Sequence, residues 1–301
     1  MEIAVLGGGH GCYAAAADMA EAGHRVRFWR RDAAALAPVL DNGAITVKDV
    51  GGRRDVPIPL PTTDLAEAVR GAALVLIPLP ATAQVGLFKQ LAPLLEDGQV
   101  VYLPPGTFGS YLLLQEMRAA GNAADVVSAE TGTLPWLCRK HGPAEVQISV
   151  RATRLPTGAF PARLSDHAFA VIAKAFPVIE PIVDALDGAL LNAGPIIHPP
   201  LILMNAGPLE HFDAWDIHNE GTQPSVRRTT DKLDAERIAI REAMGYGEPH
   251  FPLVNHYDDN LEEWMYGNSS HERLTDSGDW REKIELTSHR YMLEDVETGL
   301  A

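Results

Sequence analysis

His198 is the residue of this sequence best suited to proton-transfer chemistry, and two prolines follow it directly. Histidine changes its charge near neutral pH, so a fixed imidazole can accept and return a proton during catalysis. Because proline is favoured in the first helical turn, we expect a helix to start at Pro199 or Pro200, with His198 at its N-terminal edge. Asn205 lies seven residues further on, a spacing that predicts the same helix face.

The expected position of His198 also sets its electrostatics. The positive end of a helix disfavours an imidazolium and favours an anion, for instance the carboxylate of a keto acid. An acidic partner would therefore be needed to restore the basicity of the imidazole. The alternative interpretation is a histidine that only caps the helix or packs in the core.

A glycine-rich turn near the N-terminus predicts a second site, for a dinucleotide. The apolar strand 3–6 runs into the turn 7–12, a helical segment follows over 13–20, and 25–29 has the pattern of a second strand. Strand, turn, helix and strand within about 30 residues form the context that a dinucleotide-binding fingerprint requires. The alternative is a purely structural turn in another α/β fold.

Each position of this turn has an expected role. Gly7 permits the tight turn, and Gly9 lets the backbone approach a pyrophosphate. The pyrophosphate would lie on the N-terminal amides of the helix, which assigns His10 and Gly11 to the cofactor site. Cys12 takes the third small position, where Gly or Ala is usual, and is small enough for the helix to pack on the strand.

The end of the second strand indicates which nicotinamide cofactor binds. NAD sites usually place Asp or Glu there for the ribose 2′-hydroxyl. This strand is followed by Arg30, Arg31 and Asp32, and two guanidiniums suit a 2′-phosphate. We expect Asp32 to lie past the ribose. The pattern favours NADP(H); NAD(H), with both arginines exposed to solvent, is the alternative.

The elements that must position these residues follow from the rest of the sequence. Further strands are expected at 73–79, 99–103 and 124–129, and the sheet is expected to continue through 146–153 and 160–164, followed by a helix at 168–176. Ligands of open α/β sheets bind outside the carboxyl ends of the strands, so Pro80, at one such exit, is assigned to the cofactor site.

The composition changes at residues 192–195, and the chain beyond them has a helical pattern. We therefore predict an α/β, Rossmann-type, doubly wound sheet over residues 1–193 and a mainly α-helical substrate and catalytic domain over 194–301.

Composition and charge limit the kinds of partner and the cellular location that we expect for this protein. The chain has 301 residues and a net charge of −15. Residues 194–301 alone hold 9 basic and 21 acidic side chains, which argues against nucleic acid and anionic membranes as partners. No apolar run is long enough to span a membrane. Two cysteines and an N-terminus without the basic start of a signal peptide predict a cytoplasmic protein.

The sequence resembles the octopine/nopaline (opine) dehydrogenase family across nearly its whole length. The similar segments occur in the family's order: the turn 7–12, Glu130–Arg139, Ile197–Pro200 with Leu203–Asn205, Glu220–Val226, Leu233–Arg237 and Arg290–Asp295. The histidine-proline segment and the final Arg-Tyr-x-x-Glu-Asp are the most specific of them.

The resemblance implies reductive condensation of an α-keto acid with the amino group of an amino acid, at the expense of NAD(P)H. It implies His198 and Asp295 as the proton-transfer pair and Arg290 near a substrate carboxylate. A carboxylate on the other imidazole nitrogen would fix the tautomer, and a guanidinium fork suits carboxylate capture. The five-residue offset between Arg290 and Asp295 puts them on different faces of a regular element, which predicts a bend near Leu293.

The remaining assignments concern substrate and partners. Thr133 and Arg139, in the second similar segment, are assigned with Asn205 to substrate binding. We expect a small-molecule keto acid and an amino acid as partners, no metal, and a homodimer as an allowed assembly.

Two alternatives stay open. Glycerol-3-phosphate dehydrogenases and ketopantoate reductases resemble the first domain, but they use a catalytic lysine, and beyond residue 193 this chain has only Lys232 and Lys283. A catalytically degenerate NADP-binding relative is the second alternative. Its basis is that the family usually continues past the Glu-Asp motif, whereas this sequence ends at Ala301, so that Asp295 must be held by a docked tail.

Overall fold

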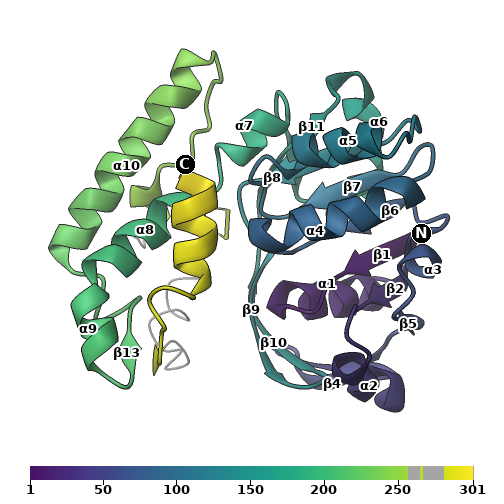
Figure 1. The fold of residues 1–301 in the computed structure, drawn as a ribbon, viewed down its shortest axis with the longest axis horizontal. Coiled ribbons are helices and arrows are strands. Elements are labelled where there is room, and N and C mark those ends of the chain that lie inside the picture. Colours follow the sequence, from purple (N-terminus) through teal and green to yellow (C-terminus); the bar gives the residue numbers. More distant parts are fainter. Residues whose placement is uncertain (257–264, 267–280, 301) are drawn as a thin grey trace.

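The computed structural model describes residues 1–256, 265–266 and 281–300, which form an α/β part and a helical part side by side (Figure 1). The α/β part contains the helices α1 (His10–Glu21), α2 (Ala33–Asn42), α3 (Leu65–Val69), α4 (Ala81–Leu91), α5 (Gly109–Ala119), α6 (Ser165–Ile172) and α7 (Ala185–Ala189), with short 3-10 turns at Ala92–Leu94 and Ala162–Leu164. The helical part contains α8 (Gly194–Met204), α9 (Ala206–His211), α10 (Pro224–Ala243), a short turn at Leu253–His256 and the C-terminal helix η5 (Tyr291–Leu300).

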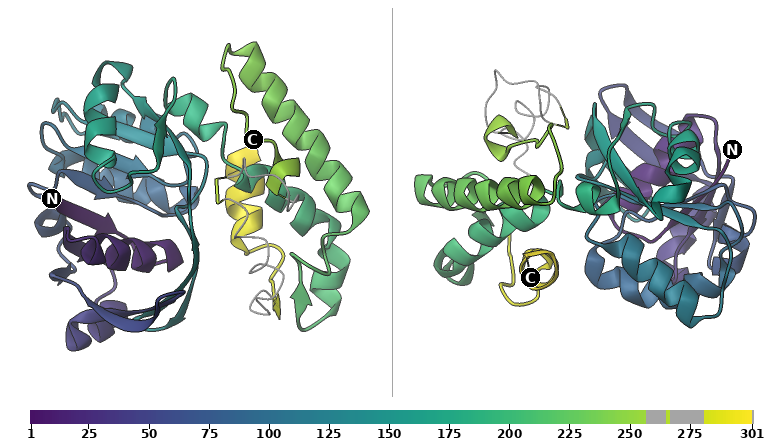
Figure 2. Two further views of the ribbon diagram at one scale, coloured as in Figure 1. Left: turned by 180° about the vertical axis from the view of Figure 1, so that it is seen from behind. Right: turned by 90° about the horizontal axis from the view of Figure 1, so that it is seen from above.

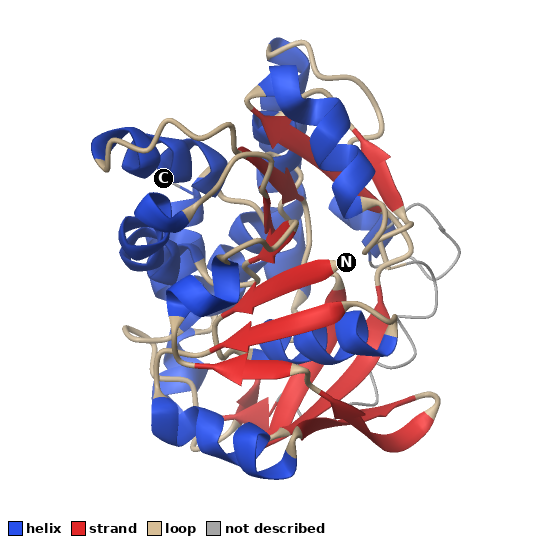
Figure 3. Ribbon diagram, turned by 90° about the vertical axis from the view of Figure 1, so that its right-hand side faces the viewer, coloured by secondary structure: helices blue, strands red, loops and turns tan. Residues whose placement is uncertain are grey.

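An eight-stranded sheet forms the centre of the α/β part. Its strands are β1 (Glu2–Leu6), β2 (Arg25–Trp29), β5 (Leu60–Thr62), β6 (Leu74–Leu76), β7 (Val100–Leu103), β8 (Val127–Thr131), β11 (Leu155–Phe160) and β12 (Ile179–Pro181). They lie in the order β12-β11-β8-β7-β6-β1-β2-β5, and all neighbours are parallel except β11 and β8. Helices cover both faces (Figure 3), which is why strands such as β7 are apolar throughout.

The strand order reverses at β1, which pairs with β2 on one side and β6 on the other. This is the topological switch point at which open α/β sheets bind ligands. One core cluster joins α1 and α6 to one face of the sheet, and a second joins α3, α4 and α5 to the other. The predicted Rossmann-type fold with a helical second part is confirmed.

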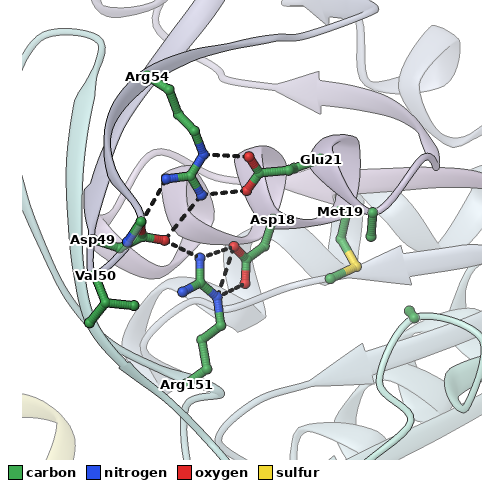
Figure 4. A pocket seen from close by; sticks show the side chains of 10 residues that line it. Asp18, Met19, Glu21, Asp49, Val50, Arg54 and Arg151 are labelled. Carbon is green, nitrogen blue, oxygen red and sulfur yellow. Dashed lines mark hydrogen bonds and ion pairs between the residues drawn. The ribbon is translucent and has the colours of Figure 1, made fainter.

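A second sheet of four strands wraps around α1. Its strands are β3 (Ala44–Asp49), β4 (Gly52–Pro57), β9 (Trp136–Gly142) and β10 (Glu145–Arg151), in the order β4-β3-β10-β9. Figure 4 shows how ion pairs fasten it: Arg151 pairs with Asp18 of α1 at 2.7 Å and with Asp49 at 2.8 Å, and Arg54 pairs with Asp49 and Glu21. The guanidinium of Arg54, then that of Arg151, holds the pKa of Asp49 well below its ordinary value. These ion pairs tie β3, β4 and β10 to α1.

The C-terminal helix of the helical part lies between α8 and the α/β part. Helix η5, yellow in Figures 1 and 2, packs on α8 and also contacts α4 of the α/β part. The long helix α10 is tied to α7 by a buried ion pair, Arg241 Nη1 to Asp187 Oδ1 at 2.5 Å. Separating the two helices would leave an uncompensated buried charge on each side, which is costly. The ion pair therefore holds α10 against α7.

Four predicted elements differ from the structure in their bounds or in the sheet that they join. Segment 146–153 does form a strand, β10, but it belongs to the second sheet, and 160–164 is the end of β11 followed by a 3-10 turn. The helix expected at 168–176 is α6, which ends at Ile172. The helix expected from Pro199 or Pro200 begins earlier, at Gly194, so that both prolines lie within it.

The division of the chain at residues 193 and 194 stays a prediction, and it coincides with the start of α8. Among the described residues, no helix combines the length and apolar character needed to cross a membrane.

Candidate active site

The glycine-rich turn leaves room for a bound dinucleotide. Gly7 has a φ of +120°, and a Cβ there would stand 2.5 Å from Leu79 and 2.8 Å from the Cys12 sulfur. Such a position excludes any side chain. At Gly9, by contrast, a Cβ would meet nothing within 4 Å. Helix α1 begins at the next residue, His10. The open space in front of a helix N-terminus fits a pyrophosphate.

Cys12 and Gly11 pack the helix against its surroundings. The Cys12 sulfur is fully buried, 3.5 Å from the carbonyl oxygen of Pro78, and burial raises the pKa of its thiol to about 12. It is therefore a neutral packing group. A Cβ on Gly11 would stand 2.9 Å from the Leu134 side chain. Pro80, which the sequence analysis assigned to the cofactor site, directly precedes α4.

The residues after β2 have three different environments. Arg30 turns back toward the glycine-rich turn, where its Nη1 donates to the Tyr13 hydroxyl at 2.6 Å. Arg31 is exposed. Asp32 caps α2, accepting a hydrogen bond from the Ala35 amide at 3.1 Å. That Asp32 lies past the ribose stays a prediction.

His198 and Asp295 meet in the helical part. Nδ1 of His198 lies 2.7 Å from Oδ2 of Asp295, and the two side chains are 17% and 6% exposed. His198 sits within α8, and Asp295 comes from η5. Burial lowers the pKa of His198 below 6.5, while the charge of Asp295 opposes that shift. A neutral imidazole held by a carboxylate is thus set up to accept a proton.

A tyrosine fixes the imidazole from its face. The rings of Tyr291 and His198 stack with centroids 3.7 Å apart and planes 11° apart. The Tyr291 hydroxyl lies 2.8 Å from Nε2 of His218. Asp295 therefore holds the edge of the His198 ring, and Tyr291, anchored by His218, holds its plane.

Two arginines lie near the His198–Tyr291 stack. The positive charges of Arg290 and Arg139 both act on Tyr291, opposing the rise in its pKa that burial causes. The Arg290 side chain is 57% exposed, and its Nη1 lies 3.9 Å from Glu294. Arg139 comes from β9 of the α/β part, whereas Arg290 belongs to the helical part.

The bend expected near Leu293 is absent. Residues 291–300 instead form one helix with i→i+5 hydrogen bonding, a winding that brings residues five apart close together. The same helix is docked: its Gly299 lies against Pro195 of α8.

Two predicted substrate residues, Asn205 and Thr133, make hydrogen bonds within the protein. Both amide hydrogens of Asn205 are donated to carbonyl oxygens, those of Leu201 at 2.8 Å and Gly221 at 3.0 Å, and its oxygen accepts from Trp215 at 3.1 Å. These bonds give Asn205 a structural role, and its contact with substrate stays a prediction. Thr133 is also buried, with its hydroxyl 2.6 Å from that of Tyr266, which places it in a packing contact.

Some residues of this region escaped the sequence analysis. Glu130, at the end of β8, is fully buried and accepts hydrogen bonds from the amides of Phe108 at 3.1 Å and Ser110 at 2.6 Å, at the start of α5. Burial raises its pKa to about 7. Tyr291 could have been found, since it lies inside the Arg-Tyr-x-x-Glu-Asp motif. His218 had no sequence signal, because its partner is 73 residues away.

Comparison with known proteins places this geometry in a family. The family model described as NAD/NADP octopine/nopaline dehydrogenase, alpha-helical domain, matches residues 181–301. The model of the NAD-dependent glycerol-3-phosphate dehydrogenase N-terminus matches residues 2–108, which lie within the α/β part. An opine dehydrogenase of Arthrobacter sp. (strain 1C) is 29% identical over 304 residues, covering 99% of this chain and 82% of the relative.

Solved structures share the fold. Octopine dehydrogenase with NADH and L-arginine has a TM-score of 0.69 at 19% identity, covering 99% of this chain and 82% of that one. Yersinopine dehydrogenase with bound NADP+ has a TM-score of 0.65 at 17% identity, covering 100% and 76%.

A dinucleotide-binding sheet joined to a helical part with a buried His–Asp pair defines a two-domain, NAD(P)-dependent oxidoreductase. The match to the helical part and the relative that covers nearly the whole chain make the assignment more specific. The helical part thus matches the octopine/nopaline dehydrogenase family, and nearly the whole chain is similar to an opine dehydrogenase.

Proposed function

We propose that this chain condenses an α-keto acid with the amino group of an amino acid and reduces the product to a secondary amine. The observation that carries the proposal is the buried pair of His198 and Asp295, with the Arg290 guanidinium 5.0 Å from the centre of the Tyr291 ring that stacks on His198. When bound, NAD(P)H supplies the hydride. The protein has to move protons and hold carboxylates.

His198 moves the proton. Its Nδ1 is engaged by Asp295, which leaves Nε2 as the nitrogen that exchanges a proton with substrate. Because burial keeps the imidazole neutral near pH 7, Nε2 can take the proton that the amino group releases as it adds to the keto carbon. It returns that proton to the keto oxygen, which becomes a hydroxyl, and then carries a second proton from the nitrogen to that hydroxyl, which leaves as water while the carbon–nitrogen double bond forms. Asp295 stabilises the imidazolium that exists while each proton is carried.

Arg290 and Arg139 hold the substrate carboxylates. A keto acid and an amino acid bring one carboxylate each, and guanidinium forks bind such groups with two parallel hydrogen bonds. Because one arginine belongs to each part of the molecule, the two substrates would be held from opposite sides of the His198–Tyr291 stack. This arrangement favours the approach of nitrogen to carbon.

The cofactor is NADP(H) in this proposal. Arg30 and Arg31 follow β2, where a ribose 2′-substituent is read, and no acidic residue stands there before Asp32, which caps α2. Structures with a similar fold contain NADH in one case and NADP+ in another. The proposed preference for NADP(H) therefore depends on the arginines of this chain. Replacing Arg30 and Arg31 together by alanine should weaken the binding of NADPH at least tenfold and the binding of NADH much less.

A matrix of substrates tests the reaction. Pyruvate, 2-oxoglutarate and oxaloacetate are each combined with the common amino acids, and oxidation of NADPH and of NADH is followed. The expected result is oxidation that requires both substrates, with a secondary amine detected by mass spectrometry, and its loss in His198→Ala. Oxidation with a keto acid alone would instead show a simple 2-hydroxy-acid dehydrogenase, and the proposal would fail.

A further inference from the structure

Arg30 places the Nε and Nη2 side of its guanidinium beside the glycine-rich turn. Its Nη1 is used twice, donating to the Tyr13 hydroxyl at 2.6 Å and to the Ala35 carbonyl at 2.7 Å. These bonds fix the plane of the group. Within residues 1–256, 265–266 and 281–300, Nε and Nη2 have no acceptor. Both lie against Gly8, where an added Cβ would stand 2.7 Å from Nη2 and closer to Nε. A fixed pair of parallel donors matches a phosphate.

A second cation shares the same tyrosine. Lys140, on β9, has its Nζ 4.2 Å from the centre of the Tyr13 ring, and the Arg30 Cζ is 5.5 Å from that centre. The Tyr13 ring attracts both cations, but they repel each other. Burial, then the charge of Arg30, lowers the pKa of Lys140. In the part of the chain that the structure describes, no carboxylate pairs with either cation. A dianion close to both cations would supply the missing counter-charge.

The backbone places this pair of cations at the cofactor site. The amide of Lys140 donates to Nδ1 of His10, the first residue of α1, at 2.8 Å. Strand β9 therefore passes beside the N-terminus that faces the pyrophosphate, while Arg30 stands at the exit of β2, where the 2′-position of the adenosine ribose is read. We propose that Lys140 joins Arg30 in binding the 2′-phosphate of NADP(H) and selects NADP(H) over NAD(H).

This inference rests on the NADP(H) preference of the proposed function and adds a ligand from the second sheet. Binding measurements test it without any turnover. Dissociation constants are measured for NADPH, NADH, 2′,5′-ADP and 5′-ADP with the wild-type chain, Lys140→Gln and Lys140→Arg. The matched control is Lys48→Gln, which removes the same charge from an exposed lysine of β3 in the same sheet. Lys140→Gln keeps the main-chain bond to His10, and its thermal midpoint confirms folding.

The expected result is that Lys140→Gln weakens NADPH and 2′,5′-ADP about tenfold or more. NADH and 5′-ADP should stay within about twofold, Lys140→Arg should keep most of the affinity, and Lys48→Gln should bind like the wild type. Equal weakening of NADPH and NADH would show a pyrophosphate ligand and overturn the inference, as would unchanged binding. If the wild type itself did not prefer NADPH, the cofactor preference would fail. If the wild type preferred NADPH and Lys140→Gln kept that preference, the role of Lys140 would be disproved while the NADP(H) preference itself would stand.

Discussion

Oε1 of Glu294 accepts a hydrogen bond from the amide of Ala81 at 3.1 Å, although 213 residues separate them. Ala81 is the first residue of α4 in the α/β part, and Glu294 directly precedes Asp295 on η5. The contact thus connects the start of a helix near the cofactor site to the helix that delivers the partner of His198. A carboxylate at a helix N-terminus is stabilised by the helix dipole, so the contact orients η5 as well as joining the two parts.

Replacing Glu294 tests this connection. Glu294→Ala removes a buried, charge-assisted hydrogen bond, which should lower the free energy of unfolding by about 1.5–3 kcal/mol. It should also lower kcat, because Asp295 loses its fixed position. Glu294→Gln keeps an acceptor for the Ala81 amide and should have a smaller effect on both. Glu297→Ala, on an exposed position of the same helix, is the control. If Glu294→Ala matched that control in thermal midpoint and kcat, the contact would have no positioning role.

Asp295→Asn should separate the charge of the pair from its geometry. Asparagine has the same shape, but it carries no charge to oppose the lowering of the His198 pKa. The ionisation of His198 in the pH profile of kcat/KM should therefore move to lower pH. An amide facing Nδ1 can also select the wrong tautomer, so kcat/KM should fall by about 100- to 10,000-fold. His198→Ala should fall by a similar factor with cofactor binding unchanged. A profile that stays in place in Asp295→Asn would disprove the electrostatic coupling.

Asn205→Ala distinguishes a structural residue from a substrate ligand. The substitution leaves two buried carbonyl oxygens and the indole N–H of Trp215 without their partner. Each buried group that loses its partner costs up to about 3 kcal/mol. The midpoint of thermal denaturation should therefore fall clearly. KM for both substrates should stay near that of the wild type in the folded fraction. A large rise in KM with unchanged stability would restore the substrate contact that the sequence analysis predicted.

Sequence reasoning succeeded where the signal is local. The turn at Gly7 needs a positive φ, the alanine-rich segment after it favours a helix, and 25–29 alternates as a strand, so β1, α1 and β2 could be derived in order. It failed where partners are remote. The pattern of β10 predicts a strand but does not say which sheet it joins, and the ion pair between Arg151 and Asp18 that decides this spans 133 residues.

The start of α8 shows a second kind of failure. Proline is compatible with helical φ, but beyond the first turn each proline gives up the main-chain hydrogen bond to the residue four positions earlier. The side chain of Asn192 accepts from the Gly194 amide at 3.0 Å, and this local bond satisfies an early donor of the helix. Pro199 and Pro200 then lie in its second turn. The family resemblance named His198 and Asp295, but their separation of 2.7 Å depends on the docking of η5, which no local pattern encodes.

The buried carboxyl of Glu130 predicts a pH dependence of stability that is independent of catalysis. Its pKa is about 7 in the folded chain, against 4.5 as the ordinary value. Between these values the folded state binds more protons than the unfolded state, so the free energy of unfolding should fall as the pH rises from 4.5 to about 7. For a group this deeply buried, the full effect is on the order of 3 kcal/mol.

Glu130→Gln should remove that contribution. The side-chain oxygen of glutamine can still accept from one of the amides of Phe108 and Ser110, while the group no longer titrates. Urea unfolding at a series of pH values from 4.5 to 7.5 is the measurement, with exposed Glu297→Gln as the control for a lost surface charge. The wild type and the control should lose stability toward pH 7 relative to Glu130→Gln. Parallel curves for all three would mean that Glu130 stays ionised at the start of α5, where the helix dipole and two amide donors would then outweigh the cost of burial.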